Sequence, residues 1–145
     1  MIIDVNKLKQ QGKTEDDFSF EYIPEGQLID LPNAVIDGYV KVNAKATLSG
    51  RDLFVDGEAT FNVKGECSRC LEPANAVVVV CFSADFSLLA GAEYPIKAGK
   101  ADLTPAVDEA IIMGAPMVIY CQDDCKGVCP ECGVNLNKGN CNCKN

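Results

Sequence analysis

Hydrophobic and polar residues alternate along the middle of the chain, which is the pattern of β-strands with one buried face. The clearest alternation lies in AVIDGYVKVNAKATLSG, beginning at Ala34, where β-branched and aromatic side chains are frequent. SGRD predicts a turn, and LFVDGEATFNVKGEC, beginning at Leu53, predicts a second strand. NAVVVVCFSADFSL, beginning at Asn75, has the composition of a third, buried strand. Successive strands joined by short turns predict an antiparallel sheet.

The pattern changes on either side of these strands. Residues 1–21 form an acidic lead-in, for which we expect one short helix or strand, and residues 90–99 are typical of a loop. DLTPAVDEAIIMGAPM predicts a short helix that Thr104 caps, with Pro105 at its first position and Pro116 beyond its end. The core-facing side of this helix is expected to carry Val107, Ala110, Ile111 and Gly114. The fold class predicted is therefore α+β, an antiparallel β-rich domain with one helix near residues 104–115.

Composition and charge limit the function. The chain has 145 residues, enough for one domain, and its 48% hydrophobic content is typical of a globular protein. It carries 21 acidic and 13 basic residues and no histidine, for a net charge of −8. Binding to a polyanion needs a basic surface, so any contact with RNA should be local.

The first residues lack the apolar core of a signal peptide, and no segment approaches the roughly 18 apolar residues that cross a membrane. We therefore expect a cytoplasmic protein without membrane contact. Thiols stay reduced in that compartment, so nine cysteines favour metal binding or catalysis over disulfides.

Six of the nine cysteines lie within 23 residues of the C-terminal segment YCQDDCKGVCPECGVNLNKGNCNCKN. Few large apolar side chains separate them, so this segment cannot build a hydrophobic core of its own. We expect a metal to order it. The chain then divides into a β-rich domain at residues 1–120 and a cysteine-rich tail at residues 121–145, packed on that domain.

CPECG is the most specific motif in the tail. Two thiolates separated by two residues can bind one tetrahedral ion, and Gly133 allows the backbone to curl under the second sulfur. Since the chain has no histidine, the other ligands should also be cysteines or, less favourably, carboxylates. Iron on four thiolates is chemically allowed at such a motif, but we expect zinc.

Eight cysteines fall into four pairs, which is enough for two sites of four thiolates and two zinc ions. The pair in CSRC is expected at a hairpin tip, where it cannot hold zinc alone. We expect its partners to come from the start of the tail, while the rest of the tail closes around a second ion. The ninth cysteine, Cys81, is expected to be a small buried hydrophobic residue. The ligand sets predicted are Cys67, Cys70, Cys121 and Cys125 for one ion and Cys129, Cys132, Cys141 and Cys143 for the other.

CSRCLEP, DLTPAVDEAI and CQDDCKGVCPECGVNLNKGNCNC, in this order, resemble the YceD family of bacterial large ribosomal RNA subunit accumulation proteins, in its form with a full cysteine tail. The resemblance covers about Arg51 to Cys143. It implies a non-enzymatic role in the accumulation and maturation of large-subunit (23S) ribosomal RNA, and hence in ribosome biogenesis. The partner implied is a large-subunit precursor particle or a ribosomal protein. Two zinc ions on eight thiolates would bring the net charge to about −12, which favours a basic ribosomal protein over naked RNA.

Two other functions fit part of the same pattern. One is a zinc-ribbon-like protein-interaction module unrelated to ribosomes. The other, a thiol redox protein, is less favoured because a thioredoxin-like CxxC opens a helix, whereas LEP after CSRC leads into a strand. No catalytic residue or small-molecule substrate is predicted, since the chain lacks a histidine base, GxSxG and a phosphate loop. If RNA is contacted, the candidate residues are Arg69, Lys126, Lys138 and Lys144.

Overall fold

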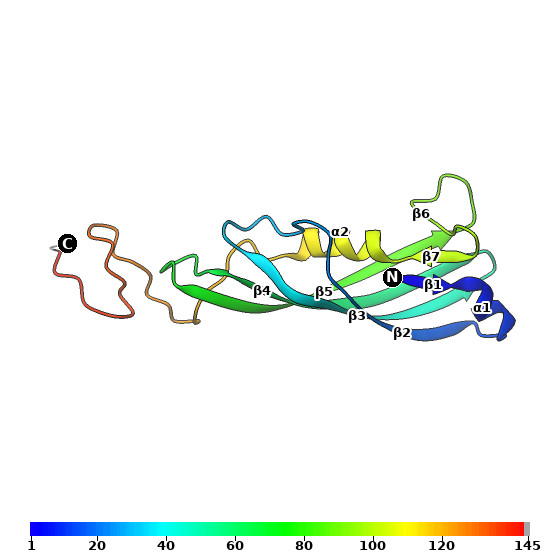
Figure 1. Ribbon diagram of the computed structural model, residues 1–145, viewed down its shortest axis with the longest axis horizontal. Helices are drawn as coiled ribbons and strands as arrows, with labels where there is room; N and C mark the ends of the chain where they lie inside the picture. The colour runs from blue at the N-terminus through cyan, green and yellow to red at the C-terminus, as the bar shows by residue number, and fades with distance from the viewer. Residues whose placement is uncertain (144–145) are drawn as a thin grey trace.

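The structure, a computed structural model, describes residues 1–143. It contains a five-stranded sheet in the order β2-β3-β4-β5-β6 and a separate two-stranded sheet, β1-β7 (Figure 1). The predicted class, a mostly antiparallel β-rich fold, is confirmed, with a second short helix near the N-terminus. The elements are β1 (Ile2–Asp4), α1 (Val5–Gln10), β2 (Glu15–Tyr22), β3 (Val35–Ser49), β4 (Asp52–Glu66), β5 (Pro73–Ser87), β6 (Tyr94–Pro95), β7 (Lys100–Asp102) and α2 (Thr104–Gly114).

The three predicted strands form the long centre of the sheet. β3, β4 and β5 have 15 residues each and pair antiparallel, from Ser49 opposite Asp52 at one turn to Glu66 opposite Pro73 at the other. The side chains that alternate inward supply most of the core, including Val42, Val55 and Phe61. The CSRC turn lies at the tip of the β4–β5 hairpin, as predicted.

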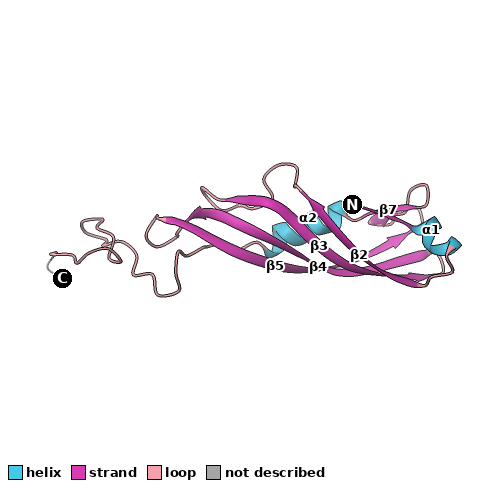
Figure 2. Cartoon of the chain, turned by 60° about the horizontal axis from the view of Figure 1, so that its bottom comes forward, coloured by secondary structure: helices cyan, strands magenta, loops and turns pink. Residues whose placement is uncertain are grey.

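One face of this sheet is covered and the other is open. In β5 the even-numbered side chains point into the core, as Val80 and Phe82 do, whereas Val77 and Val79 are exposed. The prediction of a fully buried strand is therefore wrong, and so is that of a buried Cys81, whose side chain is exposed. The physical reason is that α2 packs against one face of β5 and leaves the other to solvent (Figure 2).

The N-terminal segment is more ordered than expected. It forms β1, the six-residue helix α1 and β2, an edge strand that pairs antiparallel with β3. In β2 the aromatic residues Phe18, Phe20 and Tyr22 alternate with exposed polar ones. This strand pattern was hidden by the acidic residues around it.

Helix α2 confirms the predicted C-terminal helix in place and orientation. Of the predicted core-facing residues, Val107 and Ile111 are buried, Ala110 is half-buried and Gly114 is exposed. Ala106 is buried as well, and the helix ends two residues before Pro116. Its N-terminus differs from the prediction, because the N-cap residue is Leu103 and the carboxylate of Asp102 accepts the backbone amide of Thr104 at 3.0 Å. Thr104 is already helical, and its hydroxyl instead accepts a hydrogen bond from the Met1 amine at 2.8 Å.

After α2 the chain runs back beside β5 to the hairpin tip, and the tail projects from that end of the elongated molecule (Figure 1). Residues 115–143 contain no helix or strand, and one isolated bridge joins Val128 to Asn135. None of the helices in residues 1–143 is long and apolar enough to span a membrane.

Candidate metal centres

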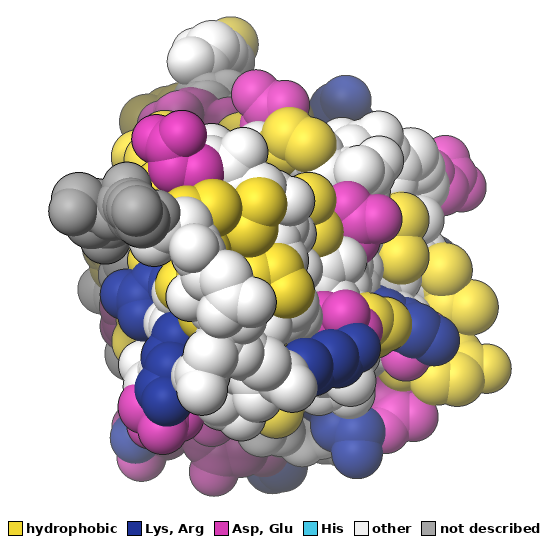
Figure 3. All heavy atoms as spheres, turned by 90° about the vertical axis from the view of Figure 1, so that its left-hand side faces the viewer, with side chains coloured by type: hydrophobic (Ala, Val, Ile, Leu, Met, Phe, Trp, Pro, Cys, Tyr) yellow, Lys and Arg dark blue, Asp and Glu magenta, His cyan; other side chains and the backbone are white. Residues whose placement is uncertain are grey.

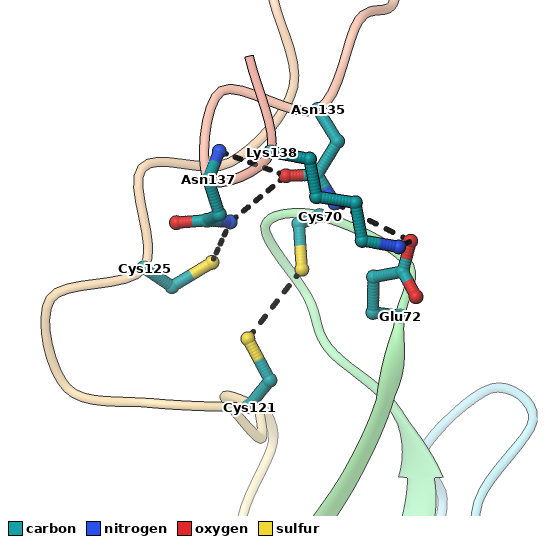
Figure 4. A network of polar contacts seen from close by, with 7 residues as sticks. All are labelled: Cys70, Glu72, Cys121, Cys125, Asn135, Asn137 and Lys138. Carbon is teal, nitrogen blue, oxygen red and sulfur yellow. Dashed lines mark hydrogen bonds and ion pairs between the residues drawn. The ribbon is translucent and has the colours of Figure 1, made fainter.

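The first group of thiols lies where the hairpin tip meets the tail. We call Cys67, Cys70, Cys121 and Cys125 the hairpin cluster; their sulfur atoms all lie within 4.8 Å of one another. The Sγ atoms of Cys67 and Cys125 are 3.7 Å apart. Those of Cys70 and Cys121 are 3.5 Å apart (Figure 4). Each of these contacts joins residues more than fifty positions apart in sequence. The tertiary fold therefore assembles this cluster.

A tight backbone turn presents the two hairpin thiols on the same side. The amide of Leu71 donates to the carbonyl of Cys67 at 2.9 Å, and the amide of Cys67 donates to the carbonyl of Glu72 at 2.8 Å. Leu71 adopts a left-handed conformation, with φ of 62°, to close the turn. The turn thus places Cys67 and Cys70 in a chelating arrangement.

Backbone and side-chain contacts dock the start of the tail on this turn. The amide of Ser68 donates to the carbonyl of Ile119 at 2.8 Å. The Arg69 guanidinium lies 4.3 Å from the ring centroid of Tyr120, and its Nη1 donates to the carbonyl of Cys125 at 3.1 Å. The cation–π contact and this hydrogen bond hold the two tail cysteines opposite the hairpin pair.

The second group, which we call the tail cluster, is built locally. Its four cysteines are Cys129, Cys132, Cys141 and Cys143, and their sulfur atoms also lie within 4.8 Å of one another. The Sγ of Cys141 is 3.2 Å from that of Cys129 and 3.6 Å from that of Cys132. Gly133, whose amide donates to the carbonyl of Cys129 at 2.8 Å, has φ of +72°, the left-handed conformation that the CPECG motif needs.

Both clusters fit a tetrahedral metal bound by four thiolates. A Zn–S bond of about 2.3 Å implies sulfur atoms about 3.8 Å apart around the ion. The closest sulfur pairs are 3.2–3.7 Å apart and all pairs lie within 4.8 Å, so each cluster brackets this spacing and small side-chain shifts would accommodate the ion. Such sites are closed, because four protein ligands leave no position for water or substrate.

The electrostatics of the thiols also fit a cation. Burial opposes ionisation of Cys67, but backbone amides of Arg69, Cys121 and Cys70 donate to its sulfur and lower its pKa to about 6. In the same cluster, loss of hydration and the neighbouring thiol of Cys70 raise the pKa of Cys121 to about 12. The tail cluster repeats this contrast: backbone donors lower the pKa of one thiol to about 6, and neighbouring thiols raise that of another to about 12. Four thiolates this close repel one another, and a divalent cation at their centre would offset that repulsion.

Three polar residues connect the two clusters (Figure 4). The amide group of Asn137 donates to the Sγ of Cys125 at 3.3 Å, and its oxygen accepts the Lys126 amide at 2.8 Å. Lys138 pairs with Glu72 at 2.6 Å, and Asn135 donates to the same carboxylate at 3.4 Å. The loop between Cys132 and Cys141 therefore contacts the hairpin cluster. These contacts could not be predicted from the sequence, because an asparagine in a polar loop carries no signal of its own.

The structure brings the eight paired cysteines together in the same two sets of four that the sequence analysis proposed. Two of the basic residues that were predicted to contact RNA already have partners within the protein. Arg69 is engaged by Tyr120 and Lys138 by Glu72, while the side chain of Lys126 is exposed. Lys144 lies outside the described residues. At this end of the molecule, basic side chains are interspersed with acidic ones (Figure 3).

The fold and sites define a class: a mostly antiparallel β-sheet scaffold with two four-cysteine groups that could each bind a metal ion. A family model described as "Large ribosomal RNA subunit accumulation protein YceD" matches residues 55–145. The chain belongs to this family, and all eight clustered cysteines lie within the matched region.

The curated proteins that resemble the chain are distant relatives. An uncharacterized protein of Mycobacterium leprae (strain TN) is 27% identical over 131 residues, covering 79% of this chain and 58% of that protein. An uncharacterized protein of Mycobacterium tuberculosis (strain H37Rv) is 30% identical over 129 residues, covering 79% of this chain and 54% of that protein. The chain thus spans somewhat more than half the length of these relatives. No solved structure matches it.

Proposed function

We propose that this protein is a non-enzymatic zinc-binding factor that supports the accumulation of 23S ribosomal RNA during biogenesis of the large ribosomal subunit. The observation that carries this proposal is the coincidence of two features. The family match, whose description names large ribosomal RNA subunit accumulation, spans residues 55–145, and this region contains both cysteine clusters. The role we assign to the metal is structural, since closed thiolate sites offer no position for a reacting molecule.

Each cluster holds one zinc ion in this proposal. The donor set is entirely sulfur and the spacing suits a tetrahedral ion, which iron could also satisfy. Elemental analysis of the purified protein should give two zinc ions per chain. A visible absorption spectrum typical of iron bound by thiolates would show that the bound metal is iron and not zinc. The structural role of the metal would be unchanged.

The two ions divide the chain into the parts expected from the sequence: a β-rich domain at residues 1–120 and a tail at residues 121–145. The hairpin cluster fixes the tail to the hairpin tip, and the tail cluster gives the tail its internal shape. Together they present a rigid extension at one end of the sheet. We propose that this extension contacts a cytoplasmic large-subunit precursor particle.

Charge favours a ribosomal protein as the immediate partner. The chain has a net charge of −8 before its thiolates are counted, and two four-thiolate zinc sites would bring it to about −12. Ribosomal RNA would be repelled by such a protein, whereas a basic protein would be attracted. Direct RNA contact is then local, through Lys126 and, where their present contacts open, Arg69 and Lys138.

Gradient sedimentation tests this function. A tagged chain is expressed in bacterial cells in which large-subunit precursors accumulate, and each fraction is probed for the protein and for precursor 23S RNA. We expect the protein to sediment with the precursors and Cys81→Ser to behave in the same way. Cys70→Ser should shift towards the top of the gradient, because the tail is no longer fixed to the hairpin.

Two outcomes would count against the proposal. If the wild-type protein stays at the top of the gradient while precursors are abundant, the ribosomal role is wrong. If it instead purifies with RNA polymerase or another non-ribosomal assembly, the alternative of a zinc-ribbon-like interaction module is correct.

A further inference from the structure

One edge of the main sheet is unpaired over much of its length. β5 pairs with β4 along all 15 residues but with β6 only at Phe86 and Ser87. The amide of Ile96 donates to the carbonyl of Ser87 at 2.8 Å, so Ser87 directs its backbone groups away from β4. Because this direction alternates along a strand, the odd-numbered residues of β5 direct theirs outward as well. Within residues 1–143, no backbone hydrogen bond satisfies the outward groups of Val77, Val79, Cys81 and Ser83.

The two edges of the sheet differ in how they are protected. β2, at the opposite edge, has the sequence EDDFSFEY and carries four acidic residues. The free part of β5, PANAVVVVCFSAD, has a proline only at its first residue and a charge only at its last, and the eleven residues between Pro73 and Asp85 carry no charge. Proteins usually protect exposed edges with charge, proline or a cover, since a bare apolar edge pairs with other chains. The absence of such protection on β5 indicates an edge that is used for pairing.

A groove lies beside this edge. It has a volume of about 430 Å³ and is lined by residues 79–83 of β5 and by one side of α2, which includes the small residues Ala106 and Ala110. Met113, also in its lining, is 88% exposed. An unpaired edge next to a helix is an arrangement that binds an extended peptide as an additional strand.

Charge identifies the type of peptide that fits. On the open face Glu58 and Asp56 stand opposite Cys81 and Ser83, whereas Glu109, in the groove lining, accepts a hydrogen bond from the Tyr94 hydroxyl. An added strand would lie about 10 Å from β4, two strand spacings, which a lysine or arginine side chain and a glutamate side chain can bridge together. A second copy of this chain fits poorly, because each copy carries a net charge of −8. A basic segment is attracted by the same charge.

We propose that the free edge of β5, Val77–Ser83, binds an extended basic segment of a partner protein as an added antiparallel or parallel strand. Apolar residues of that segment face the groove beside α2, and the alternate lysine or arginine residues lie on the open face near Asp56 and Glu58. The proposal deepens the proposed function, on which it rests for the identity of the partner as a basic ribosomal protein. The edge itself can be tested without ribosomes.

The probe is a fluorescent nine-residue peptide of alternating lysine and valine, titrated into the full-length, zinc-loaded protein and followed by fluorescence anisotropy. A peptide of the same composition with its lysines and valines in two blocks controls for charge alone. Cys81→Lys places a cation on the exposed edge and should weaken binding about tenfold, whereas Cys81→Glu should strengthen it. Ser19→Lys makes the same charge change on the opposite edge and should have a much smaller effect.

Val79→Pro removes one outward amide without removing a hydrogen bond of the sheet, and it should abolish binding of the alternating peptide. Ser19→Pro is the matched change on β2. Circular dichroism and thermal melting check the folding of both variants. The Cys81 variants keep the test decisive if Val79→Pro does not fold.

Amide hydrogen exchange gives an independent signature. The outward amides of Val77, Val79, Cys81 and Ser83 should exchange rapidly in the free protein and become protected when the peptide is bound, whereas the amides between them are protected throughout. Equal binding of the two peptides, or unchanged binding by Cys81→Lys, would overturn the proposal. So would a wild-type dimer that Val79→Pro converts to a monomer, because the occupant would then be a second copy. Peptide binding without co-sedimentation would retain the edge site and reject the ribosomal role.

Discussion

Removing one ligand from each cluster should separate the roles of the two metal ions. Cys70→Ser should leave one ion per chain, bound in the tail cluster, and free the tail from the hairpin tip. Cys132→Ser should also leave one ion, bound in the hairpin cluster, and disorder the tail beyond Gly127. The sheet should stay folded in both variants, because its core of residues such as Val42 and Phe61 contains no metal ligand.

The size of the change in amide exchange depends on which interactions other than the metal order the tail. Beyond Ile119, the buried hydrophobic residues in the described part of the chain are Cys125 and Cys129, which are themselves candidate ligands. A structural zinc ion contributes on the order of 10 kcal/mol to the state that its ligands define. Since about 1.4 kcal/mol is a factor of ten, losing the tail ion should raise amide exchange in residues 129–143 by several orders of magnitude.

The assay combines elemental analysis of zinc per chain with amide exchange on wild type and both variants. Cys81→Ser is the matched control, since Cys81 is exposed on β5 and lies outside both clusters, and it should retain two ions. Full metal content in Cys70→Ser, or a single ion in the wild type, would refute the assignment of ligands. Loss of protection in the sheet of Cys132→Ser would refute the independence of the two parts.

Two further predictions test contacts outside the ligand sets. Asn137→Ala removes the donor to the Cys125 sulfur and should lower the metal affinity of the hairpin cluster about 10–100-fold, measured by chelator competition, whereas Asn140→Ala in the same loop should not. Tyr22→Phe removes the 2.6 Å hydrogen bond to Asp108, which joins β2 to α2, and should cost about 1 kcal/mol in urea unfolding. Burial and that hydrogen bond raise the pKa of Tyr22, so its contribution is fully present below the ordinary tyrosine pKa of about 10 and declines as the pH rises above it. Wild type should therefore lose more stability than Tyr22→Phe in this alkaline range.

Two kinds of feature could be predicted from the sequence: elements with a periodic pattern of apolar residues, and metal sites indicated by the number of paired cysteines. Alternation in three long segments indicated β3, β4 and β5, and one apolar face with a following proline indicated α2. Eight cysteines in pairs left few ways to form two four-thiolate sites. These patterns are local or arithmetical, so they can be recognised without tertiary structure.

The features that were missed depend on what packs against a segment. A run of valines is apolar whether one face or both are covered, so Cys81 could not be placed without knowing that α2 covers only one side of β5. The alternation of Phe18, Phe20 and Tyr22 was overlooked among acids that protect the edge of the sheet. Asn137 acts on Cys125 through a loop whose path is set by the tail cluster, and no residue next to it in sequence indicates that contact.

The hairpin cluster can form because the segment that follows α2 is long enough to reach the hairpin tip along β5. Gly114, at the end of α2, lies against Val80, since a Cβ atom on it would be 2.5 Å from a methyl carbon of that valine. From Val80 to Pro73, at the hairpin tip, is seven residues of strand, which is about 23 Å. From Gly114 to Cys121 is also seven residues, and in extended form they cover about the same distance. The hydrogen bonds between Ile119 and Ser68 show that this segment reaches the tip. Pro116 therefore has a second consequence: by ending the helix where it does, it leaves enough extended chain to bring the first tail thiol to the CSRC turn.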